Sequence, residues 1–112
     1  MSIFKIIEKE LQAIVKELQG QGLLPPELSV DKIEATPPRE ASHGDIATNA
    51  AMVIAAQARK NPREVATLIA GHLEEISKIE KVEIAGPGFI NLTLKPSVWQ
   101  EAMLEILKAG RE

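Results

Sequence analysis

The chain has 112 residues, a formal net charge of −3 and 45% hydrophobic residues. This length and composition fit one folded domain and argue against a disordered chain. The negative charge argues against a protein that coats DNA without sequence preference, although a local contact with nucleic acid stays open. The absence of cysteine excludes disulfides, thiolate metal sites and cysteine nucleophiles.

The first half of the chain begins with an amphipathic pattern. Apolar residues at helical spacing predict a helix over residues 3–18, which Gly20 is placed to end. After a loop with two prolines, residues 30–36 predict a strand. A second proline pair ends that strand, and a polar loop, residues 39–45, follows.

Two further helices are predicted in the middle of the chain. Residues 46–58 are rich in alanine and apolar on most sides, which predicts a central, buried helix. Asp45 precedes this segment as a candidate cap. The pair Asn61–Pro62 predicts the start of a third helix, with an apolar stripe that reaches Ile76. Gly71 lies inside this helix at a cost of about 1 kcal/mol relative to alanine, and the sequence offers no reason for it.

The last part of the chain predicts a hairpin and a helix. Strands over residues 79–85 and 89–94 flank the turn Gly86-Pro87-Gly88, and a final helix is predicted over residues 96–109. The order of elements predicts an α+β fold: a small, mostly antiparallel sheet of three to four strands with helices packed on one face. The whole chain, residues 1–112, is expected to form one domain. No stretch is apolar for long enough to span a membrane, and the N-terminus does not resemble a secretory signal.

The hairpin carries the most informative candidate site. Strand residues alternate between faces, so Phe89 and Asn91 are expected on the open face, with Thr93 beside them. A nucleic-acid base can stack on an aromatic ring, and an asparagine amide can pair with a base edge, usually that of adenine. Gly86 and Gly88 carry no side chains that would block a backbone approach. In the alternative interpretation, Phe89 folds over the turn and covers the edge of the core.

Two other groups of polar residues are candidate sites. Arg59, Lys60 and Arg63 gather beside a helix start, where three positive charges could hold a phosphate or simply form a solvated corner. His43 and Asp45 suggest a catalytic pair. However, no cysteine, tyrosine or nearby second histidine completes a triad or a metal site, so a structural role is the better interpretation.

Three strings of this sequence resemble one known family. They are residues 42–51 (SHGDIATNAA), residues 58–66 (ARKNPREVA) and residues 83–92 (EIAGPGFINL). In this order and spacing they resemble the N-terminal additional domain of arginyl-tRNA synthetases. The resemblance covers nearly the whole chain, and the order of the strings argues against a chance match.

The resemblance implies a part of a larger, cytoplasmic class I enzyme that joins arginine to its tRNA using ATP. That enzyme's two-histidine signature is absent here, so the ATP site would lie in a separate catalytic domain, and this domain alone would be neither an enzyme nor a cofactor carrier. The family domain contacts the tRNA elbow and reads a base of the dihydrouridine loop, commonly adenine. Its reading residues match Phe89 and Asn91. Some members have tyrosine at the aromatic position, so only stacking carries over to Phe89.

Three functions follow as hypotheses. The leading one is a tRNA-recognition domain, whose partners would be arginine tRNA and the catalytic domain, with neither DNA nor a membrane involved. The alternative is a docking module that packs on the synthetase body through Phe89 or the last helix and reads no RNA. The third, a small enzyme built on His43 and Asp45, has the least support. The segment 42–45 could also seat the domain on the catalytic body.

Overall fold

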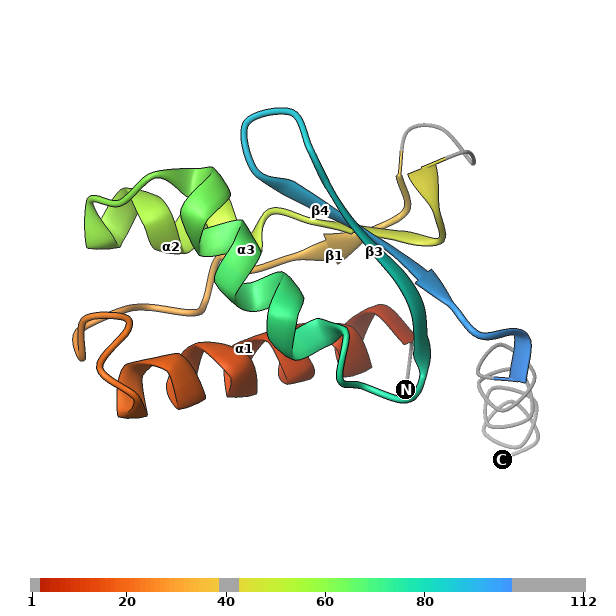
Figure 1. Cartoon of the computed structure of the whole chain (residues 1–112), viewed down its shortest axis with the longest axis horizontal. Coiled ribbons are helices and arrows are strands. Elements are labelled where there is room, and N and C mark those ends of the chain that lie inside the picture. The colour runs from red at the N-terminus through yellow and green to blue at the C-terminus, as the bar shows by residue number, and fades with distance from the viewer. Residues whose placement is uncertain (1–2, 39–42, 98–112) are drawn as a thin grey trace.

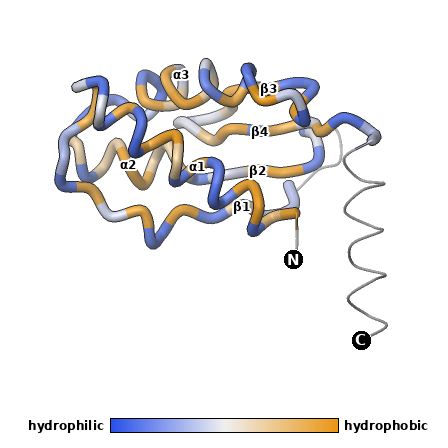
Figure 2. Tube along the Cα trace, turned by 90° about the horizontal axis from the view of Figure 1, so that it is seen from below, coloured by the Kyte–Doolittle hydropathy of each residue, from blue (hydrophilic) through white to orange (hydrophobic). Residues whose placement is uncertain are grey.

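The protein folds as three helices and a four-stranded antiparallel sheet within the part of the chain that the structure, a computed structural model, describes: residues 3–38 and 43–97 (Figure 1). The elements in chain order are α1 (Ile3–Gly20), β1 (Ala35–Thr36), β2 (Ile46–Thr48), α2 (Ala50–Ala58), α3 (Pro62–Leu73), β3 (Ile79–Ala85) and β4 (Phe89–Leu94). The strands lie in the order β1-β2-β4-β3, which Figure 2 shows from below the view of Figure 1. The predicted α+β class and its small antiparallel sheet are confirmed.

The core lies between one face of the sheet and the helices. Ile90 and Leu92 of the central strand β4 are fully buried there, and Ile46 of β2 joins them. Helix α1 contributes the stripe that the sequence predicted; its buried residues are Ile3, Ile7, Leu11, Ile14, Val15 and Leu18. Each such side chain contributes roughly 1.5–3 kcal/mol by leaving water.

The predicted helix over residues 46–58 is wrong in its first part. Residues 46–48 form strand β2, which pairs with β1 on one side and with β4 on the other. Helix α2 begins only at Ala50, whose N–H donates to Thr48 Oγ1 over 3.1 Å. The β-branched residues Ile46 and Thr48 suit a strand, and pairing with two neighbours overrides the helical pattern of this alanine-rich segment. Helix α2 is also less buried than expected, since Ala56 and Gln57 are exposed.

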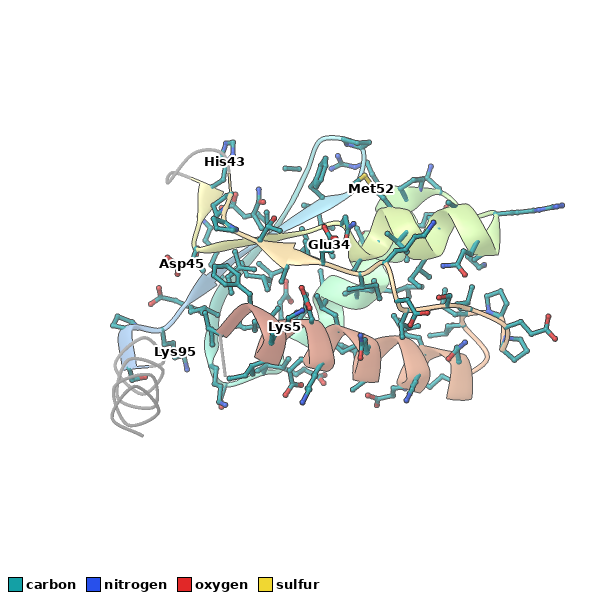
Figure 3. The ribbon with its side chains drawn as sticks, turned by 180° about the vertical axis from the view of Figure 1, so that it is seen from behind. Lys5, Glu34, His43, Asp45, Met52 and Lys95 are labelled. Atoms are coloured by element: carbon teal, nitrogen blue, oxygen red, sulfur yellow. The ribbon has the colours of Figure 1, made fainter. Side chains whose placement is uncertain are left out.

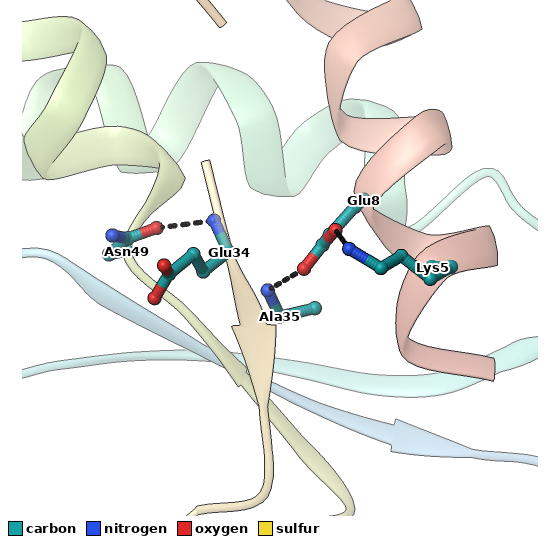
Figure 4. A network of polar contacts seen from close by, with 5 residues as sticks. All are labelled: Lys5, Glu8, Glu34, Ala35 and Asn49. Atoms are coloured by element: carbon teal, nitrogen blue, oxygen red, sulfur yellow. Dashed lines mark hydrogen bonds and ion pairs between the residues drawn. The ribbon is translucent and has the colours of Figure 1, made fainter. Parts of the chain in front are cut away.

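The predicted strand over residues 30–36 shrinks to Ala35 and Thr36. Before it the chain turns, with the N–H of Ile33 donating to the carbonyl of Val30 over 3.2 Å. Side chains from other elements then hold the backbone in place of strand partners (Figure 4). Asn49 Oδ1 accepts from Glu34 N over 2.8 Å, and Glu8 Oε2 of α1 accepts from Ala35 N over 3.0 Å.

The hairpin and the start of α3 are confirmed. Strands β3 and β4 pair antiparallel around the turn at residues 86–88. Pro62 begins α3, and Asn61 caps it by accepting from Arg63 N over 2.8 Å. Helix α3 ends at Leu73 rather than Ile76. From residue 98 on, the predicted last helix lies outside the described residues.

Candidate functional site: the outer face of the sheet

The face of the sheet away from the core carries a hollow. The strand register places Thr36, Ala47, Asn91 and Glu83 in one row across β1, β2, β4 and β3. A cavity of about 560 Å³ opens beside this row, within the size range of small-molecule sites. Its lining residues are Thr36, Pro37, Pro38, His43, Ala47, Ala85, Gly86, Phe89 and Asn91. The two predicted base-contact residues therefore share one hollow.

The ring of Phe89 stands at the cavity and remains 42% exposed. It does not belong to the hydrophobic core, so the alternative in which it covers the core edge does not describe this structure. The ring lies beside the turn, where its Cδ2 would be 3.9 Å from a Cβ placed on Gly86. An exposed aromatic ring beside a cavity is a ready stacking surface.

Asn91 lies on the predicted face, but the expectation that it is open to solvent is wrong, because only 7% of it is exposed. Its register neighbours Ala47 and Glu83 flank it on both sides. Its side-chain amide nevertheless has no hydrogen-bond partner among the residues that the structure describes. Every fully buried side-chain polar atom in this part of the chain has a hydrogen-bond partner. Because the amide of Asn91 has none, it is not fully buried and lies at the cavity surface. It can therefore donate to and accept from a ligand.

The first residues of α3 hold the hairpin turn. Arg63 Nη1 donates to the carbonyl of Gly86 over 2.6 Å. Gly88 is buried, and a Cβ on it would approach Cβ of Pro62 to 2.9 Å. Gly88 is therefore required for close packing rather than for a ligand's approach, whereas Gly86 is exposed and lines the cavity.

The three residues of the predicted phosphate cluster are all exposed at the corner between α2 and α3, but their contacts differ. Arg63 donates to the hairpin turn, whereas Arg59 and Lys60 make no side-chain hydrogen bond to a described residue. Arg59 takes a left-handed conformation at φ 55°, the one positive φ outside glycine among the described residues. It closes α2, with the N–H of Lys60 bonded to the carbonyl of Ala55 over 3.0 Å.

His43 and Asp45 do not form a catalytic pair, and Asp45 is not a helix cap. Figure 3 labels both residues, which lie on the segment leading into β2. Asp45 Oδ2 accepts from Leu94 N over 2.8 Å, and Asp45 N donates to the carbonyl of Leu92 over 2.7 Å. The carboxylate thus extends the pairing of β2 with β4. His43 lines the cavity, a position that sequence reasoning missed because only the folded sheet brings residue 43 beside the hairpin.

One ion pair sets the charge beside Asn91. Lys81 Nζ lies 2.5 Å from Glu83 Oε1 on the exposed face of β3. The hydrogen bond and the positive charge of Lys81 lower the pKa of Glu83, and Glu83 in turn raises the pKa of Lys81. Lys81 therefore offsets a carboxylate that would otherwise repel an anionic ligand here. Within residues 3–38 and 43–97, no group of three acidic, histidine or cysteine side chains could hold a metal, and no helix could cross a membrane.

Comparison with solved structures first defines the class of fold. The chain superposes on a crystal structure of arginyl-tRNA synthetase from Plasmodium falciparum with a TM-score of 0.72. The match covers 91% of this chain and 18% of that one, at 17% identity, so it establishes a shared fold alone.

Sequence comparison then defines the family. Residues 2–94 match the family described as arginyl tRNA synthetase N terminal domain, and the chain belongs to this family. It is 48% identical over 108 residues to an arginine–tRNA ligase of Nitrobacter hamburgensis, and 43% identical over 112 residues to one of Brucella ovis. The matches cover 96% and 100% of this chain but only 18% and 19% of those ligases. The family that the three sequence strings suggested is therefore confirmed.

Proposed function

We propose that this domain binds arginine tRNA at the outer face of its sheet and helps a synthetase body attach arginine to that tRNA. An unpaired base of the dihydrouridine loop would stack on Phe89 while its edge meets the amide of Asn91. One observation carries the proposal: a largely buried asparagine offers an amide without a partner to a cavity that also holds an exposed aromatic ring.

The energetics fit a positioning contact rather than a tight complex. Stacking of one base contributes about 1–3 kcal/mol, and a good amide–base pair discriminates against the wrong base by about the same amount. The net charge of −3 gives no general attraction for RNA, so we expect weak binding that falls as salt rises. Arg59 and Lys60, exposed at the α2–α3 corner, are the candidates for a phosphate contact.

An amide chemical-shift titration tests the proposal. The ¹⁵N-labelled chain would be titrated at low salt with an arginine tRNA and with the same tRNA carrying a changed dihydrouridine-loop base. We expect shifts centred on residues 86–91 that are weaker with the changed tRNA. Equal shifts with both tRNAs, or none at the hairpin, would instead favour a docking surface for the synthetase body.

Matched variants distinguish tRNA recognition from docking on the synthetase body. Phe89→Ala should weaken tRNA binding by about 5- to 150-fold, the equivalent of one stacked base. Leu23→Ala is the control, because Leu23 is equally exposed at 45% but does not line the cavity. Asn91→Ala should reduce discrimination of the base with little loss of fold stability, since its amide bonds to no described residue. In the synthetase that carries this domain, both cavity variants should raise KM for tRNA more than they lower kcat.

A further inference from the structure

We infer that Arg63 is a positioning residue, which acts on the proposed RNA contact through the hairpin turn and not by touching a phosphate. The inference rests on the proposed function, because it concerns how the ring of Phe89 is presented at the same cavity. Its physical basis is the 2.6 Å hydrogen bond from the guanidinium of Arg63 to the carbonyl of Gly86, across 23 residues of sequence.

The turn has little else to fix its shape. Gly86 has φ 55° and Gly88 has φ 150°, conformations that glycine enters and leaves readily. The bond across the turn, from Gly88 N to the carbonyl of Ala85, is 3.3 Å long, at the weak end of the range. Pro87 has no N–H to donate. The guanidinium of Arg63 is therefore an external donor that can hold the Gly86 carbonyl in one orientation.

Helix α3 supplies that donor, Arg63, whose backbone is held by two side-chain hydrogen bonds. The Asn61 side chain caps the backbone N–H of Arg63, and Thr67 Oγ1 donates to the Arg63 carbonyl over 2.9 Å. The preceding residue, Pro62, packs against Gly88. The first two residues of α3 thus contact both glycines of the turn: Pro62 packs against Gly88, and Arg63 donates a hydrogen bond to Gly86.

The hairpin turn also forms part of the cavity wall. Gly86 and Phe89 both line the cavity, and the backbone of Gly86 neighbours the Phe89 ring. If the Gly86 carbonyl rotated away, the cavity wall beside the ring would change with it. Arg63 would therefore control the ring without contacting the base.

The test compares Arg63→Gln with Arg59→Gln in the full 112-residue chain. Each variant removes one guanidinium from the same corner, but the structure shows no bond from Arg59 to the turn within its described residues. The first measurement needs no RNA: amide shifts of Gly86, Gly88 and Phe89 in the free chain. We expect clear changes for Arg63→Gln, none for Arg59→Gln, and partial retention of the native shifts for Arg63→Lys, which keeps a donor without the planar fork.

The second measurement is tRNA affinity over a range of salt concentrations, with the normal and the base-changed arginine tRNA. Arg63→Gln should lower affinity about threefold to tenfold, as expected for one lost hydrogen bond, and should reduce the preference for the normal base. The salt dependence should stay that of the parent chain. A residue that neutralises a phosphate would instead lower the salt slope by about one and leave base preference intact.

The outcomes separate the inference from the proposed function. Unchanged turn shifts in free Arg63→Gln overturn the inference whatever the tRNA does. A lowered salt slope with intact base preference also overturns it and makes Arg63 a phosphate contact. If Phe89→Ala leaves tRNA binding unchanged as well, the proposed function is wrong, and the role of Arg63 in RNA binding falls with it.

Discussion

Replacement of Gly44 by alanine tests how the segment before β2 is fastened to the centre of the sheet. Gly44 has φ 101°, a conformation that costs a residue with a side chain about 1–2 kcal/mol. A Cβ there would lie 2.6 Å from the carbonyl oxygen of Leu92, which cannot move without distorting β4. Relief of this contact would separate the two segments and break the 2.7 Å bond from Asp45 N to the same carbonyl, worth about 0.5–1.5 kcal/mol.

The sum predicts a loss of about 1.5–3.5 kcal/mol in the free energy of unfolding, a large share of the 5–15 kcal/mol typical of a domain. Urea denaturation followed by far-UV circular dichroism would measure it as a lower midpoint at unchanged slope. Gly71→Ala is the matched control. Gly71 is exposed in α3 with nothing within 4 Å of an added Cβ, so alanine should stabilise the protein by about 0.5–1 kcal/mol. A loss below about 1 kcal/mol for Gly44→Ala would refute the packing argument.

Three further changes test other contacts. Asn49→Ala removes two exposed hydrogen bonds, from Glu34 N and to the carbonyl of Lys32, and should cost about 0.5–1.5 kcal/mol by urea denaturation, whereas an unchanged midpoint would show that water replaces them. Asp45→Ala leaves Leu94 N without its acceptor, so hydrogen exchange of that amide should accelerate, and unchanged exchange would contradict the bond. Lys81→Met should raise the pKa of Glu83 towards 4.5 in a carboxyl NMR titration, and 1 M salt should do the same in the parent chain. Because Lys81 lowers the folded-state pKa of Glu83, the stabilisation that this ion pair gives the folded protein is present at neutral pH and lost as pH falls through that pKa. A Glu83 pKa that does not move in Lys81→Met would refute the pairing.

The elements predicted correctly from sequence are those whose signals are local. The cap and proline at residues 61–62 act within one turn of α3, and the hairpin joins two strands across three residues. Strand β2 could not be recognised in the same way. Its residues belong to an alanine-rich run with helical character, and they become a strand because β1 and β4, the latter far along the chain, pair with its two edges.

The candidate site was likewise predictable only where its signal is local. Alternation along one strand was enough to place Phe89 and Asn91 on a common face. The cavity itself was not predictable, because Thr36, His43 and Ala47 come from a stretch of the chain that only the folded sheet brings beside the hairpin. The burial of Asn91 was missed for the same reason, since its neighbours Ala47 and Glu83 come from other strands.

The central position of β4 has a consequence for how the domain is made. This strand is the last of the four in sequence, yet β2 and β3 both pair with it, and Asp45 bonds to Leu94 across 49 residues. During synthesis, β1 and β2 can pair with each other, but the other edge of β2 has no partner until β4, which ends at Leu94, has left the ribosome. Such a chain of non-local pairings slows folding and leaves hydrophobic surface open in the meantime. A nascent chain that stalls before residue 89 would therefore be a substrate for chaperones, and completion of a single strand would convert it into the closed domain.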